Sequence, residues 1–63
     1  MTTHGIAQYI RNHPTFQLVE IDGQEIPRIL AIEALERVNK LWPDVELMRS
    51  PDSTILTIIT NEN

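Results

Sequence analysis

Prolines at four positions divide this chain, and they set where its helices and strands can begin and end. Pro14 disfavours helical geometry in the residue before it, so the helix predicted over residues 4–12 ends there. Pro27 stands where a second helix can begin, because its missing N–H costs nothing in the first turn. Pro43 ends that helix, and Pro51 suits the second position of a type I turn. The chain is therefore expected to alternate short helices with short hairpins.

Two hairpins are predicted between these boundaries. In the first, a strand over residues 16–21 leads into Asp22-Gly23, which is the strongest short signal for a two-residue type I′ turn. Residues 45–49 and 54–60 form the strands of the second hairpin. The first turn sets the following pairs opposite each other: Ile21 and Gln24, Glu20 and Glu25, Val19 and Ile26.

Together these elements predict a single α+β domain over residues 1–63, in the order helix, hairpin, helix, hairpin. An antiparallel sheet of three or four strands is expected, with the long helix packed on one face. Thr3 suits the N-cap of the first helix. Residues 1–3 and 61–63 are expected to be frayed. The order of the strands stays open.

The clearest element is the helix expected from Pro27 to Trp42. Its apolar residues fall within an arc of about 140° and form the predicted core face: Leu30, Ala31, Ala34, Leu35, Val38, Leu41 and Trp42. Ile29 and Ile32 project to the opposite side, next to Glu36. A helix with apolar residues on its back has a second surface to cover. We therefore predict that Ile29, Ile32 and Glu36 bind a partner protein.

The last strand, residues 54–60, combines high β-propensity with no charge, proline or glycine. Such a strand is an aggregation hazard on an exposed edge, so it must be central or paired with another chain. We favour pairing with a second copy across a two-fold axis, through Ile55, Thr57 and Ile59. A central position is the main alternative, and augmentation by a different protein is the third.

Small size and the absence of cysteine favour self-association. With no cysteine, the 63 residues can form no disulfide and no thiolate metal site. Cores of this size contribute about 3–5 kcal/mol, and oligomerisation is the remaining way to add stability. We therefore expect a homodimer. No secretory signal and no membrane-length apolar run is present, so a cytoplasmic protein without a membrane partner is expected.

The sequence indicates no catalytic, metal or cofactor site, and a protein that is not an enzyme is expected. His4 and His13 are nine residues apart, which places them on opposite faces of a helix. Glu20, Asp22 and Glu25 cluster at the first turn without a nearby base or nucleophile. We interpret them as a solvated acidic turn or a docking point for a basic partner.

These observations favour a small non-enzymatic protein–protein interaction module, an adaptor or inhibitor that acts as a homodimer. Its composition is typical of accessory proteins from phages and mobile elements. The alternative is a small dimeric DNA-binding transcriptional regulator, in which Arg11 and Arg28 of two copies contribute a basic surface. A net charge of −4 disfavours nucleic acid as a partner.

Overall fold

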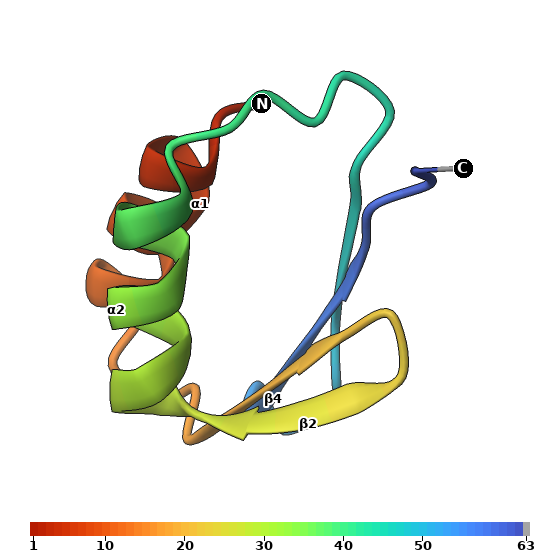
Figure 1. Ribbon diagram of the computed structural model, residues 1–63. Helices are drawn as coiled ribbons and strands as arrows, with labels where there is room; N and C mark the ends of the chain where they lie inside the picture. The colour runs from red at the N-terminus through yellow and green to blue at the C-terminus, as the bar shows by residue number, and fades with distance from the viewer. Residues whose placement is uncertain (63) are drawn as a thin grey trace.

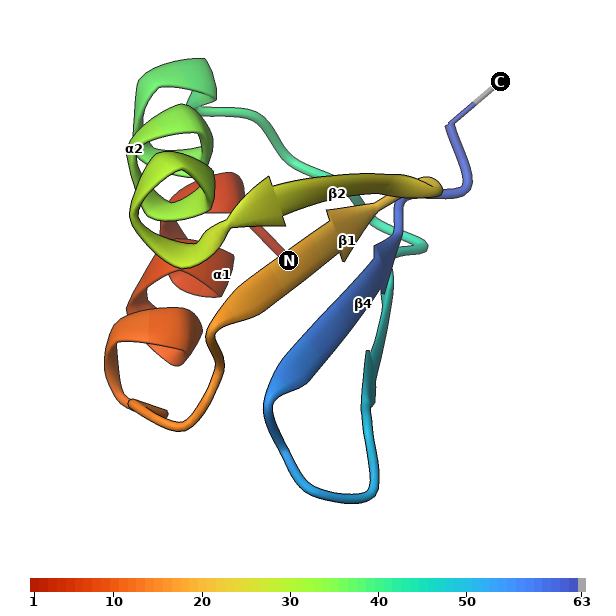
Figure 2. The same ribbon diagram turned by 90° about the horizontal axis from the view of Figure 1, so that it is seen from below.

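The computed structural model describes residues 1–62 and has two layers, a pair of helices and a four-stranded sheet (Figure 1). The α+β class is confirmed, and both helices lie on the same side of the sheet (Figure 2). Neither helix within residues 1–62 is long and apolar enough to cross a membrane. The elements are α1 (Thr3–Arg11), β1 (Leu18–Ile21), β2 (Gln24–Pro27), α2 (Arg28–Val38), β3 (Glu46–Arg49) and β4 (Ile55–Ile59).

The sheet is mixed, so the prediction of an antiparallel sheet is wrong. Its strand order is β2–β1–β4–β3, and the two central strands, β1 and β4, run parallel. The predicted register of the first hairpin is confirmed, for example by Glu20 opposite Glu25. β4 is apolar on both faces, and a central position hydrogen-bonds both of its edges within the chain.

α1 begins earlier than predicted. Thr2 is the N-cap in place of Thr3, and its side chain accepts a hydrogen bond from a backbone N–H of the first turn. Thr3 is buried, and its hydroxyl accepts a hydrogen bond from the Lys40 N–H at 2.8 Å. The Met1 ammonium donates to the Trp42 carbonyl oxygen at 3.1 Å. Hydrogen bonds therefore join these residues to the α2–β3 connection.

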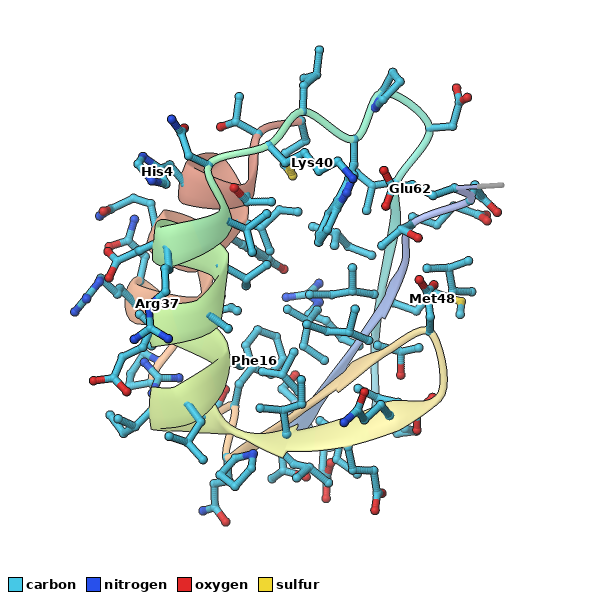
Figure 3. All side chains as sticks on the ribbon, in the orientation of Figure 1. His4, Phe16, Arg37, Lys40, Met48 and Glu62 are labelled. Carbon is cyan, nitrogen blue, oxygen red and sulfur yellow. The ribbon has the colours of Figure 1, made fainter. Side chains whose placement is uncertain are left out.

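The C-terminal residues reach the same connection. The Asn61 side-chain amide donates to the Asp44 carbonyl oxygen at 2.7 Å, and Lys40 Nζ lies 2.9 Å from Glu62 Oε2 (Figure 3). Asn61 and Glu62, which were predicted to be frayed, are thus bonded to the rest of the fold. Asn63, the last residue of that prediction, lies outside the described residues.

α2 ends at Val38, one turn before the end predicted at Trp42. Asn39 adopts the left-handed conformation, with φ of 49°, and this terminates the helix. The chain then turns and carries Trp42 into the core, where it is 7% exposed. Its indole N–H has no hydrogen-bond acceptor within residues 1–62.

The buried face of α2 is rotated relative to the predicted one. Ala31 and Leu35 are buried as predicted, but Ile32 is buried with them. Leu30 and Val38, which were assigned to the core face, are exposed. The reason is α1, which packs along the flank of α2 that carries Ile32. A pattern within one helix does not reveal which flank a second helix will cover.

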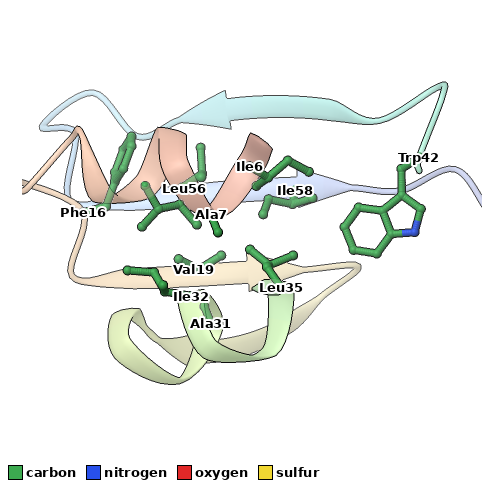
Figure 4. Close-up of a cluster of buried hydrophobic side chains, with 11 residues drawn as sticks. Ile6, Ala7, Phe16, Val19, Ala31, Ile32, Leu35, Trp42, Leu56 and Ile58 are labelled. Carbon is green, nitrogen blue, oxygen red and sulfur yellow. The ribbon is translucent and has the colours of Figure 1, made fainter. Parts of the chain in front are cut away.

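One hydrophobic core fills the space between the helices and the sheet (Figure 4). The connections contribute Phe16 and Trp42, which lie at opposite ends of the core. The helices and strands contribute the remaining buried apolar residues: Ile6, Ala7, Ile10, Val19, Ala31, Ile32, Leu35, Leu56 and Ile58.

Candidate functional site

The helices cover one face of the sheet, and within residues 1–62 no further layer covers the other face (Figure 1). Side chains alternate between the two faces along each strand. Val19, Leu56 and Ile58 are buried on the helix side. The residues next to them along the strands point the other way, and together with their own register partners they form the opposite surface, which we call the open face: Leu18, Glu20, Glu25, Pro27, Glu46, Met48, Ile55, Thr57 and Ile59.

Four apolar side chains of the open face lie around its central residue, Thr57. Leu18 and Ile55 are register partners on the two parallel strands, and Ile59 lies further along β4. These three side chains are half-buried by their neighbours in the sheet. Met48 on β3 is 50% exposed and points away from the helices (Figure 3). These four residues lie on three strands around Thr57, and we call them the apolar strip.

Carboxylates flank this apolar strip. Glu20 and Glu25 lie directly opposite each other on β1 and β2, and Glu46 lies on β3. Like charges in opposite positions destabilise a sheet. Neither of the two ion pairs found within residues 1–62 involves these glutamates. Arg49 pairs in register with Leu56 and so belongs to the helix side. The open face therefore combines apolar surface with uncompensated negative charge.

The three residues predicted to bind a partner do not form one accessible surface. Ile29 is 63% exposed, whereas Ile32 is 4% exposed and belongs to the core. The Glu36 carboxylate accepts two hydrogen bonds from Arg11, at 2.9 and 3.3 Å. The predicted docking surface therefore does not hold for Ile32, because α1 covers this flank of α2.

The contacts of Glu36 hold the two helices together. The hydrogen bond from Arg11 keeps the pKa of the Glu36 carboxyl below its usual range and raises the pKa of the Arg11 guanidinium. His4 Nε2 lies 2.6 Å from the Glu36 carbonyl oxygen. Because the Arg11–Glu36 pair is about half exposed, it aligns the helices more than it stabilises them.

The three residues predicted to mediate self-association, Ile55, Thr57 and Ile59, all lie on the open face. β4 pairs with β1 on one side and with β3 on the other, so it offers no free edge to a second copy. The prediction of an edge strand is wrong, and the alternative of a central strand is confirmed. A partner could contact these side chains on the open face, but it could not pair with the backbone of β4.

Asp22, at the first turn, has a structural role. Its φ of 48° is the positive value that a type I′ turn requires. The Thr60 N–H donates to Asp22 Oδ1 at 2.9 Å, and the Thr60 hydroxyl donates to Oδ2. These bonds, chiefly the one from the hydroxyl, hold the pKa of the Asp22 carboxyl below its ordinary value of 3.8. Asp22 thus ties the turn to the end of β4 and is separate from the Glu20–Glu25 pair.

This contact predicts a loss of stability in acid. Because the pKa of Asp22 is lower in the folded state, its stabilising effect is complete above pH 3.8 and disappears as the pH falls through the folded pKa. Asp22→Asn should be less stable than the natural chain at neutral pH, and the difference should shrink below pH 3.8. Urea unfolding at several pH values measures it. Asparagine tolerates the same φ, so a pH-independent difference would contradict the charge explanation.

The two histidines lie apart, as their spacing predicts. His4 contacts α2, whereas the Nδ1 atom of His13 lies 2.8 Å from the Tyr9 carbonyl oxygen. Within residues 1–62, no group of three or more potential ligands could hold a metal ion, and the same residues enclose no pocket.

Arg28 has a structural role that its sequence context does not reveal. Its guanidinium donates hydrogen bonds to the carbonyl oxygens of Ile10, His13 and Phe16, at 2.8 to 2.9 Å. It thereby provides hydrogen-bond donors for carbonyl oxygens at the C-terminal end of α1 and in the loop that follows. The acceptors are 12 to 18 residues away in the chain, so no local motif could identify them.

Comparison of the chain with protein-family models, with curated proteins and with solved structures gave no significant match.

Proposed function

We propose that this chain is a small non-enzymatic protein-interaction module that binds a basic partner protein on the open face of its sheet. The observation that carries the proposal is the opposed Glu20–Glu25 pair beside the apolar strip. An adaptor or inhibitor role in the cytosol belongs to the same proposal, and the lack of cysteine fits that compartment.

The apolar side chains of the two central strands support a covering partner. Here the two central strands are parallel, and their side chains Leu18 and Ile55 meet on the open face. A partner segment placed across them would bury apolar surface that the chain itself leaves accessible.

Charge indicates which partner fits this surface. Glu20, Glu25 and Glu46 flank the apolar strip. The register of the strands places no lysine or arginine on the open face. A second copy stacked on the same face would bring carboxylates against carboxylates. A partner with lysine or arginine beside apolar side chains would neutralise them, which gives both affinity and selectivity.

The DNA-binding alternative has less support. It needs Arg11 and Arg28 to contact phosphates, but Arg11 bonds to Glu36, and Arg28 bonds to three carbonyl oxygens. Lys40 pairs with Glu62. Phosphate recognition draws on several cations gathered on one face.

The sharpest test reverses one charge of the opposed pair. Glu25→Lys, on an edge strand, should stabilise the fold by about 0.5 kcal/mol because a like-charge pair becomes an attractive one. The same change should weaken binding of a basic amphipathic peptide by roughly fivefold, as expected for about 1 kcal/mol. A synthetic peptide alternating lysine with valine is a suitable probe. Its binding is followed by the NMR shifts of the backbone amides of β1 and β4.

Two controls make this result specific. Glu33→Lys changes the net charge equally on the helix layer, and it should leave peptide affinity unchanged. A peptide alternating glutamate with valine should not shift the β1 and β4 amides. If the lysine peptide binds Glu25→Lys and the natural chain equally well, or perturbs only the helices, the proposed function is wrong.

A further inference from the structure

The flank of α2 opposite α1 carries an exposed apolar ridge. Leu30, Ala34 and Val38 follow one another at four-residue spacing, so they lie along one side of the helix. Leu30 is 55% exposed and Val38 is 51% exposed, while Ala34 between them is half-buried. We call these three residues the α2 ridge.

The α2 ridge faces away from the rest of the helix layer. Glu36 marks the side of α2 that α1 covers, through its hydrogen bonds with Arg11. Ala34 precedes Glu36 by two residues, which places it about 200° around the helix, on the opposite side. In Figure 2, α1 lies on one side of α2, and within residues 1–62 Leu30 and Val38 remain more than half exposed.

We propose that the α2 ridge pairs with the α2 ridge of a second copy of this chain, with the helices antiparallel and a two-fold axis passing near Ala34. In this arrangement Leu30 lies beside Val38 of the second copy, and Val38 lies beside Leu30 of the second copy. Ala34 at the centre has the smallest side chain of the three, so the two helices can approach closely. Both large side chains of each ridge are then buried.

Charge complementarity supports a second copy as the occupant. Glu33 and Arg37 lie along one side of the ridge, and neither belongs to an ion pair formed within residues 1–62. Arg37 projects from the outer side of α2 (Figure 3). An antiparallel two-fold arrangement brings this side of one helix against the same side of the other. It therefore places Glu33 near Arg37 of the second copy, twice. The ridge is thus self-complementary, unlike the open face, and the inference does not depend on the proposed function.

The first experiment measures mass against concentration by analytical ultracentrifugation. The natural chain should show a dimer that dissociates on dilution. Leu30→Gln combined with Val38→Gln should give a monomer with unchanged helix content, because both side chains are exposed in the single chain. A natural chain that stays monomeric at the highest concentrations used for NMR would overturn the proposal, as would an unaltered dimer in the double variant.

Charge reversal tests the orientation of the two helices. Glu33→Lys should raise the dissociation constant of the dimer roughly tenfold, because two attractive contacts become repulsive. Combining Glu33→Lys with Arg37→Glu should restore dimerisation. Glu25→Lys is the matched control, and it should leave the dimer unchanged while weakening binding of the basic peptide. A combined variant as weak as Glu33→Lys alone would rule out the antiparallel arrangement.

Disulfide trapping locates the two-fold axis, since the natural chain has no cysteine. Ala34→Cys should form a disulfide-linked dimer under mild oxidation, because the two copies meet at this position. Ile29→Cys is the control, and it should cross-link much more slowly although Ile29 is 63% exposed. Faster cross-linking of Ile29→Cys would place the dimer contact elsewhere and overturn the proposal.

Discussion

Phe16→Ala is expected to unfold this domain at room temperature. Phe16 is fully buried at one end of the core, and its ring lies 6.0 Å from that of Tyr9 and 5.8 Å from that of His13. Removing a buried phenylalanine side chain costs about 3–5 kcal/mol, because apolar contacts are lost and a cavity remains. A domain of this size has about 3–5 kcal/mol of total stability from its core. Far-UV circular dichroism and amide NMR dispersion should therefore report an unfolded chain.

An exposed position provides the control for this loss. Leu41→Ala also deletes apolar atoms, but Leu41 is 60% exposed, so the unfolding free energy should change by about 0.5 kcal/mol or less. If Phe16→Ala still unfolded cooperatively with a loss below about 1 kcal/mol, the aromatic ring would not occupy the core as described.

Arg28→Met should have the second largest effect. It leaves three backbone carbonyl oxygens, one in the last turn of α1 and two in the α1–β1 connection, without the donor that now binds them at 2.8 to 2.9 Å. Hydrogen bonds to a charged group contribute about 1.5–3 kcal/mol, and part of this returns when water reaches the carbonyls. We expect a loss of about 2 kcal/mol in urea unfolding, with faster hydrogen exchange in the last turn of α1.

Two further variants separate geometry from charge. Arg28→Lys keeps the charge but lacks the planar fork of donors, so it should recover only part of the lost stability. Arg49→Met removes an exposed arginine whose side chain donates no hydrogen bond within residues 1–62, and it should be nearly neutral. Full recovery in Arg28→Lys would show that charge alone, without the three-carbonyl geometry, explains the effect.

The interaction residues were predicted only in part. Ile55, Thr57 and Ile59 were selected because an uncharged strand needs cover, and they do lie on the open face. The prediction that they lie on an edge strand was wrong, since β4 is central and has no free edge. For α2, the broad apolar stripe was recognised, but Leu30 was assigned to the core and Ile32 to the surface. The periodicity of apolar residues indicates that a helix has an apolar side, but it does not indicate which elements cover that side.

Local sequence signals predicted the start of most elements to within about two residues, and they predicted the pairing of the first hairpin. Pro14 and Asp22-Gly23 act through backbone preferences that span only a few residues, so their effects could be inferred locally. The strand order and the buried flank of α2 follow from the packing of the whole fold and have no local signal. Both depend on how apolar surfaces from distant segments are covered: β4 is buried between β1 and β3, and α1 packs over Ile32. The strand order and the buried flank therefore depend on the whole chain, because apolar surfaces from all segments compete for burial in the same core.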